Sequence, residues 1–359
     1  DFCLSRGLGD VYKRQVPGDA ALFGSAITAP STVLVDTPHT VSYLRFDSAN
    51  AYTIGANGSG NLSLNNGSSI AAVTVTSGSH TIAENVALLS NTNLLPATGT
   101  TLTVSGVISG AGRSVDINGS GSVELTGTNT YSGATSLTNG TLTVSAGAIN
   151  TSALTVGSAA AGASGVNAAL RLTGGTFNAT QFTALSAGPS NVSSITIGGS
   201  AQVTLPAHPT ARGSGSTATL TLDSTTGFLS PAATTATYMP AFTFDNAYLT
   251  ANGAKFNIPT GRDITIGQVL ENATEQVGTL TKSGVGTLTL SGANLYSGAT
   301  TVLAGALSIG NVDALGTLDA GTTVADGGRV VFNPLATGAT VAENFTVSGN
   351  GTASNGVLN

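Results

Sequence analysis

Short runs of alternating apolar and polar residues fill most of the chain, and Gly or Asn separates one run from the next. In "GTLTLSG" (286–292), Leu288 and Leu290 share one face and the threonines share the other. The same alternation returns in "SITIGGSAQVTL" and "TATLTLDSTTG". An apolar residue at every second position predicts a half-buried strand, and the apolar spacing typical of a helix is missing. The pattern therefore predicts an all-β chain.

One pattern occurs twice, in two distant parts of the chain. A gapless alignment of Gly121–Val144 with Gly286–Ile309 gives 11 identical residues in 24 positions. The matches include Asn129 with Asn294 and Tyr131 with Tyr296 in the same register as the aliphatic positions, which low complexity alone does not explain. Such internal repetition is typical of solenoid architectures.

Each copy contains three short strands, which we interpret as one turn of a single-stranded, right-handed parallel β-helix. At ~22–24 residues per turn, residues 16–359 would form about 14–16 turns, and a strand spacing of ~4.8 Å gives a rod on the order of 70 Å long. Aliphatic residues would face inward and Thr and Ser outward. Gly and Asn would occupy the corners, where Gly supplies positive φ and Asn tolerates it. Residues 230–260 are the least regular, and we expect a longer loop there.

Residues 1–15 differ in texture from the rest of the chain. The segment "DFCLSRGLGDVYKRQ" contains three of the 11 basic residues and the single cysteine, Cys3. It resembles translated adapter read-through at the end of a metagenomic contig, and the alternative is a genuine, disordered N-terminal arm. We therefore expect residues 1–15 to lie outside the fold and 16–359 to form one continuous domain, since no charged or Pro-rich linker interrupts it. Without cysteine, that domain cannot be held together by disulfides.

Composition excludes several function classes. Charged residues make up 8% of the chain and the net charge is −6, which argues against nucleic acid as a partner, because binding it requires clustered Lys and Arg. The chain has no run of 18 apolar residues, so we expect no transmembrane helix in it, and we find no n-region and h-region typical of a signal peptide in its first residues. With no Trp, we expect a core of Val, Leu, Ile and Ala.

Two segments, within repeats bounded at 117–145 and 282–311, carry a family resemblance. "NGSGSVELTGTNTYSGATSLTNGTLTVS" and "KSGVGTLTLSGANLYSGATTVLAGALSIGN" resemble the autotransporter-associated β-strand repeat, also called the passenger-associated transport repeat. The resemblance implies a right-handed β-helix exported to a Gram-negative cell surface, carried across the outer membrane by a C-terminal barrel. The chain ends at "ASNGVLN", in mid-repeat, so we expect it to be truncated at both ends, with the barrel or another sorting domain missing.

Candidate chemistry is sparse. His39, His80 and His208 lie far apart with no partner cysteine, so we expect surface or corner residues and not metal ligands. The spacing of Asp223 and Asp245 is close to one expected turn, so the two could stack on one face, whereas Arg262 and Asp263 come next but break that spacing. Such a cluster is typical of polysaccharide-cleaving β-helices, whereas Asp at solvated corners is the simpler interpretation. Whether the four residues meet in one groove discriminates the two.

Tyr131 and Tyr296 allow two interpretations. An exposed tyrosine array would stack on sugar rings, whereas a tyrosine that packs over a turn would be structural. We favour the second, because two copies so far apart in the chain cannot form one platform on a rod. No phosphate-binding, metal or nucleophile motif is present, so we expect no catalytic, cofactor or metal site.

These observations favour a structural stalk or passenger segment of a secreted or surface-displayed bacterial protein, associated with the outer membrane. Its role would be adhesion or biofilm contact with surface glycans or other cells, and the repeats would assist translocation and folding. The alternative is a carbohydrate-active β-helix enzyme of the polysaccharide lyase or glycoside hydrolase type.

Overall fold

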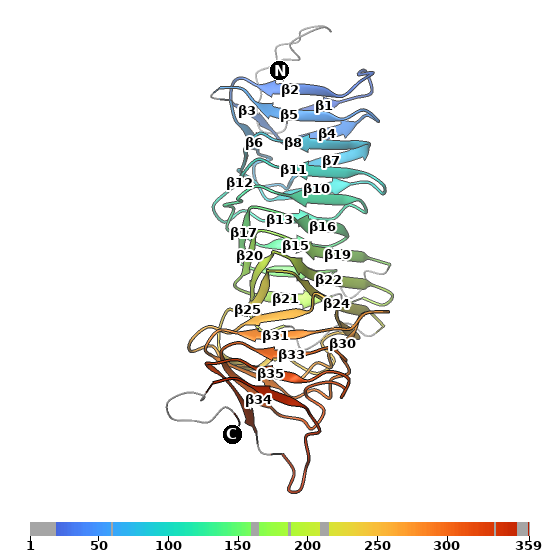
Figure 1. The fold of residues 1–359 in the computed structure, drawn as a ribbon. Helices are drawn as coiled ribbons and strands as arrows, with labels where there is room; N and C mark the ends of the chain where they lie inside the picture. The colour runs from blue at the N-terminus through green and yellow to red at the C-terminus, as the bar shows by residue number, and fades with distance from the viewer. Residues whose placement is uncertain are drawn as a thin grey trace.

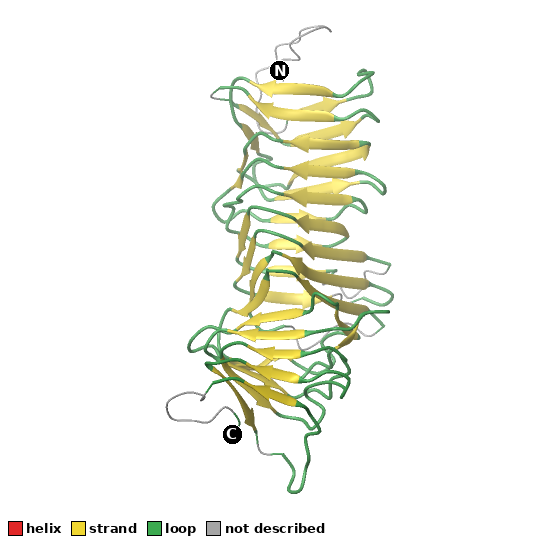
Figure 2. Ribbon diagram, in the orientation of Figure 1, coloured by secondary structure: helices red, strands yellow, loops and turns green. Residues whose placement is uncertain are grey.

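The computed structural model describes residues 19–58, 60–158, 165–185, 188–208, 215–333, 335–349 and 358. Within these ranges the chain forms 37 strands and no helix, and it winds into a rod of about 14 turns with β1 and β37 at opposite ends (Figures 1 and 2). The predicted all-β solenoid with parallel strands is confirmed. The segment 1–15, with Cys3, lies outside the described residues.

Each strand pairs in parallel with a strand one turn away, and the strands assemble into five sheets, named here by their first strand. The β1 sheet has the order β1 (Ala20–Phe23), β4 (Tyr43–Asp47), β7 (Ala71–Ser77), β10 (Thr92–Pro96), β13 (Val115–Ile117), β15 (Thr135–Leu137), β18 (Leu154–Val156) and β21 (Phe182–Leu185). The β2 sheet has the order β2 (Ser31–Val35), β5 (Tyr52–Ala56), β8 (Ser79–Ile82), β11 (Thr101–Val104), β14 (Ser122–Leu125), β16 (Gly140–Val144), β19 (Asn167–Leu172), β22 (Val192–Gly199), β24 (Thr217–Ser224), β27 (Asn246–Leu249) and β30 (Glu271–Asn272).

The other three sheets complete the cross-section. The β3 sheet contains β3 (His39–Val41), β6 (Leu62–Leu64), β9 (Val86–Leu88) and β12 (Ile108–Ser109). The β17 sheet has the order β17 (Ala148–Thr151), β20 (Thr176–Ala179), β23 (Gln202–Leu205), β25 (Phe228–Pro231), β28 (Ala254–Asn257), β31 (Leu280–Ser283), β33 (Thr300–Val302), β35 (Thr322–Val324) and β37 (Phe345–Val347). The β26 sheet has the order β26 (Thr235–Met239), β29 (Ile264–Ile266), β32 (Thr287–Leu290), β34 (Gly305–Ile309) and β36 (Gly328–Phe332).

The alternating pattern sets which side chains face inward. In β32, Leu288 and Leu290 are fully buried while the two threonines are half-buried, and β24 alternates in the same way along its whole length. Burying one such leucine contributes about 1.5–3 kcal/mol relative to leaving it exposed. The interior is therefore a stack of mainly aliphatic side chains. The expected core of Val, Leu, Ile and Ala is incomplete, because aromatic rings such as Phe46, Phe177 and Phe256 are also buried at many points along the rod.

The length of a turn departs from the expected value. In the first repeat Ser122 pairs with Thr141, and the second repeat spaces its paired strands identically, so the turn is short in both. Between β4 and β7, by contrast, Tyr43 pairs with Ala72, and the turn is much longer. One repeat is therefore more than one turn: its first and third strands, β14 and β16 or β32 and β34, are neighbours in one sheet. The interpretation of one repeat as one turn was wrong, because an "Asn-x-Tyr" crossing replaces one of the three strands.

The two repeats also use different sheets. The first repeat places β14 and β16 in the β2 sheet and β15 in the β1 sheet, whereas the second places β32 and β34 in the β26 sheet and β33 in the β17 sheet. The motif therefore does not mark one fixed side of the rod. It is a local unit that shortens the turn wherever it occurs.

Residues 230–260 contain more regular structure than the sequence indicates. The strands β25, β26, β27 and β28 lie within or across this stretch, so the expected longer loop shrinks to residues 240–245, between β26 and β27. Here the β1 sheet has ended and the β26 sheet begins, and His208 lies between them: its ring centroid is 5.4 Å from that of Phe182 and 5.1 Å from that of Tyr238. Aromatic packing keeps the interior filled where the sheet changes.

Glycine, but not asparagine, supplies the left-handed corners. Gly140 and Gly305, at the same repeat position, have φ of 81° and 68°. In the described residues the only other residue types with positive φ are Ser190, Phe242 and Glu275. The expectation that Asn takes this conformation was wrong, because the repeat asparagines form hydrogen bonds between turns instead.

Candidate functional site

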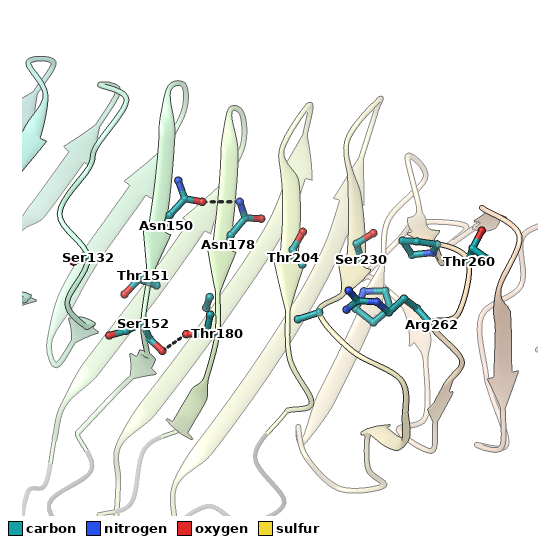
Figure 3. Close-up of a pocket in the computed structure, with 14 residues that line it drawn as sticks. Ser132, Asn150, Thr151, Ser152, Asn178, Thr180, Thr204, Ser230, Thr260 and Arg262 are labelled. Carbon is teal, nitrogen blue, oxygen red and sulfur yellow. Dashed lines mark hydrogen bonds between the residues drawn. The ribbon is translucent and has the colours of Figure 1, made fainter. Parts of the chain in front are cut away.

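A shallow groove lies on the outer face of the β17 sheet (Figure 3). Its volume is about 680 Å³. The residues that line it are mostly small and polar: Ser132, Asn150, Thr151, Ser152, Asn178, Ala179, Thr180, Thr204, Ser230, Pro231, Ala232, Pro259, Thr260 and Arg262. The groove crosses several turns of the rod, so its long direction follows the rod axis.

Strand register aligns the polar side chains of the groove in a column. Asn150 pairs with Asn178, Asn178 with Thr204, and Thr204 with Ser230, so one polar residue from each of four turns lies beside the next (Figure 3). Parallel pairing spaces these positions by about 4.8 Å. The groove thus presents a regular series of amide and hydroxyl groups.

Some of the polar groups in the groove form hydrogen bonds within the protein, and others are free to bind a ligand. Asn178 Nδ2 donates to Asn150 Oδ1 at 2.8 Å, and Thr180 Oγ1 donates to the carbonyl of Ser152 at 2.6 Å (Figure 3). Ser230 Oγ donates to the carbonyl of Asn257 at 2.6 Å. The Thr204 hydroxyl has no hydrogen-bond partner in the described part of the protein. The groove therefore combines a rigid ladder with at least one hydroxyl available to a ligand.

Arg262 supplies the only charge among the lining residues. It comes from the turn between β28 and β29, and its side chain points back along the groove toward Ser230 and Thr204 (Figure 3). Among the residues that the structure describes, no carboxylate forms an ion pair with its guanidinium. A half-buried, unpaired guanidinium offers up to five donors to an acceptor from outside.

The candidate carboxylates do not assemble into a cluster. Leu222 pairs with Leu249, so Asp223 lies opposite Thr250 and Asp245 lies opposite Ala218. The two carboxylates are thus offset by about five residues along the strands, roughly 17 Å. Their predicted stacking was wrong, because the turn here is longer than the spacing between the two aspartates.

Each of these carboxylates accepts structural hydrogen bonds. Asp223 accepts from Thr250 Oγ1 at 2.6 Å, Asp245 from the backbone N–H of Ala218 at 2.8 Å, and Asp263 from the backbone N–H of Thr287 at 2.7 Å. Of the four residues considered from the sequence, only Arg262 lines the groove. The arrangement expected of a carboxylate cluster is therefore absent from the groove in the described chain.

The histidines are buried, which corrects the expectation of surface or corner residues. His80 stacks on Phe46 with centroids 4.7 Å apart, its Nδ1 accepts from the N–H of Tyr52 at 2.9 Å, and its Nε2 donates to the carbonyl of Ser77 at 2.8 Å. Burial lowers the pKa of His208 to about 4 and also lowers the pKa of His39. In the described ranges no three His, Cys, Asp or Glu residues form a group that would hold a metal ion.

The repeat tyrosines pack inside the rod. Tyr131 and Tyr296 are buried, and their hydroxyls lie 2.8 Å and 2.6 Å from the hydroxyls of Thr135 and Thr300. Burial raises the pKa of Tyr131 to about 12 and raises that of Tyr296 as well. The interpretation of these residues as turn-packing tyrosines is confirmed, since neither ring is available to a ligand.

Sequence reasoning missed what the repeat asparagines do. Asn129 Oδ1 accepts from the N–H of Ile108 at 2.9 Å, and its own N–H donates to the carbonyl of Ala148 at 2.8 Å, so it connects the preceding and the following turn. Asn294 makes the same pair of bonds with Leu270 and Asp313. The occurrence of Asn at the same position in both repeats was the sequence signal that could have indicated this bridging role.

The two repeats are similar to a known family of sequence repeats. A parallel solenoid of short turns, with buried Tyr and bridging Asn at equivalent repeat positions, defines a structural repeat protein. Residues 118–144 and 280–309 match the model of the passenger-associated-transport-repeat, so the chain contains two copies of this repeat and fits an autotransporter passenger segment. No curated protein and no solved structure matches the chain. Since the described residues form no helix, they include none that could span a membrane.

Proposed function

We propose that this chain is a rod-shaped passenger segment displayed at the surface of a bacterium, where it makes adhesive or biofilm contacts. The observation that carries the proposal is the combination of two passenger repeats with a polar groove that follows the rod axis. A rod holds such a surface away from the cell, and contact over several turns adds weak interactions into one stable attachment.

The repeats would serve export and folding. Residues 16–359 contain no cysteine, so the segment can cross a membrane extended without breaking disulfides. Each turn then docks on the previous one, since a solenoid is stabilised by nearest-neighbour contacts. The short turns of the two repeats, each with a bridging Asn, would be the points where stacking is most closely defined.

We further propose that the segment binds without cleaving. Glycoside hydrolysis generally uses two carboxylates beside the scissile bond. None of the residues that line the groove carries a carboxylate. We propose no catalytic, metal or cofactor residue in the part of the chain that the structure describes, and the partners would be surface glycans or other cells.

Display on a living cell tests the function. The chain is fused to the transport unit of an autotransporter in a laboratory Gram-negative strain, and protease treatment of intact cells verifies that it is exposed. Cells that carry it should adhere to polysaccharide-coated surfaces and form biofilm more than cells with the transport unit alone. Exposed chain without any gain in adhesion would contradict the proposal.

A further inference from the structure

We propose that the groove on the β17 sheet binds an acidic polysaccharide that lies along the rod axis, with the guanidinium of Arg262 holding one of its carboxylates. This inference rests on the proposed function, because it names the ligand class of the adhesive surface. Three features of the groove support it: its shape, the chemistry of its walls and its charge.

The shape fits an extended polymer. Apart from Ser132, which precedes β15, the lining residues come from β17, β20, β23, β25, the residues directly after these strands and the turn after β28, so the groove continues across successive turns and is open along its length. Its polar positions recur at about 4.8 Å, a spacing comparable with the length of one sugar unit in an extended chain. A ligand with a repeating unit of similar length can therefore make similar contacts at each turn.

The walls match both sides of a sugar ring. Asn178 and Thr204 offer amide and hydroxyl groups that can donate to and accept from ring hydroxyls. Ala232 and Pro259 offer apolar surface to the C–H faces of the sugar. Hydrogen bonds between neighbouring strands, such as the one from Asn178 to the preceding turn, hold this wall in place, so binding requires little ordering of the protein.

Charge selects an acidic polymer of low charge density. A guanidinium pairs with a carboxylate through two parallel hydrogen bonds, and no lining residue repels an anion. Nucleic acid carries a phosphate on every residue and needs many cations. A groove with a single cation does not provide them, whereas a glycan with occasional uronic acids needs only one at a time.

Binding is measured with the full chain, and the probe is polygalacturonate in which most carboxylates are methyl-esterified, so that only occasional uronic acids are charged. This polymer is called polygalacturonate below, and uncharged dextran is the comparison. Affinity electrophoresis gives the dissociation constant from the retardation of the protein in native gels. Polygalacturonate should retard the protein and dextran should not. Arg262→Gln should weaken binding by at least about tenfold, because a charged hydrogen bond contributes about 1.5–3 kcal/mol and about 1.4 kcal/mol corresponds to tenfold.

Two further variants control the result. Arg171→Gln removes the same charge from an exposed position on β19, in a different sheet, and should bind as the unmodified protein does. Thr204→Glu places a negative charge in the middle of the groove and should weaken polygalacturonate binding even if Arg262→Gln does not fold. Equal loss in Arg171→Gln and Arg262→Gln, equal retardation by dextran, or no retardation by polygalacturonate would overturn the inference.

The display assay separates this inference from the proposed function. If displayed Arg262→Gln adheres as well as the unmodified chain and polygalacturonate does not retard the protein, the groove is not the site and the adhesive function stands. If the unmodified chain gives no adhesion, the proposed function fails, whatever the electrophoresis shows.

Discussion

Asn294 accepts a hydrogen bond at 2.9 Å from the backbone N–H of Leu270, one turn back along the rod. One of the three strands of the turn is missing between β32 and β33. The side-chain carbonyl of Asn294 therefore takes the place of a strand as the acceptor for the N–H of Leu270. Because both groups are buried, removing the side chain leaves a donor unsatisfied. The repeat thus keeps a short turn closed without a third strand.

Asn294→Ala should therefore lower the free energy of unfolding by about 1–3 kcal/mol, the cost of a buried unsatisfied donor. Urea denaturation followed by circular dichroism measures it. Asn333→Ala, at an exposed position, is the control and should stay within about 0.5 kcal/mol. Equal effects of the two substitutions would show that the bridge contributes nothing.

The alternating pattern predicted the strands and their inward faces, since Leu288 and Leu290 are buried as expected. It did not predict which residues stack. Asp223 and Asp245 looked one turn apart, yet the strand pairings show that turn length differs along the rod, and the repeat motif that marks a short turn is absent from this stretch. The polar column of the groove depends on this register, so the groove was out of reach from sequence alone. His80 was misplaced because its partners are backbone groups, which composition does not reveal.

Gly305 combines a left-handed backbone with a close contact. Its φ is 68°, and a Cβ there would lie 2.6 Å from the carbonyl oxygens of Gly284 and Gly286 in the preceding turn. Gly327 has φ of 88° with open space around its Cβ position. Comparing alanine substitutions at Gly305 and Gly327 therefore separates the cost of backbone strain from the cost of steric overlap.

Gly327→Ala should cost about 1–2 kcal/mol, the strain of a left-handed alanine. Gly305→Ala should cost more than this, because the backbone of two turns must also move apart. Thermal unfolding of both variants gives the comparison. Equal midpoints would mean that the turns separate without cost.

Lys282 buries its amine among backbone carbonyls. Its Nζ donates to the carbonyls of Ser283, Gly284 and Ala304 at 3.0, 2.6 and 2.8 Å. Burial, together with the charge of Arg329, lowers the pKa of Lys282 to about 8. The unfolded chain, with a lysine pKa of about 10.4, binds more protons between these values, so stability rises as pH increases from about 8 to about 10.

Lys282→Met should remove this dependence. The difference in unfolding free energy between the unmodified protein and the variant should shift in favour of the unmodified protein by on the order of 2 kcal/mol between about pH 7 and pH 10. Urea titrations at the two pH values measure it, and other lysines and tyrosines cancel in the difference. A difference that does not change with pH would refute a lowered pKa.

His208 affects the stability of the protein at acidic pH, whereas Lys282 affects it at alkaline pH. Its ring lies among Phe182, Tyr238 and Phe244, and burial lowers its pKa to about 4. The unfolded chain, with a histidine pKa of about 6.5, binds the proton first. The stability contributed by the neutral ring is therefore present above about pH 6.5 and is lost as pH falls toward about 4.

His208→Phe keeps an aromatic ring of similar size and cannot be protonated. Relative to the unmodified protein, the variant should gain on the order of 2–3 kcal/mol between about pH 7 and pH 4, because only the unmodified protein must exclude a proton in order to stay folded. Urea denaturation of both proteins across this range tests it. Parallel pH profiles would show that protonation of His208 does not oppose folding.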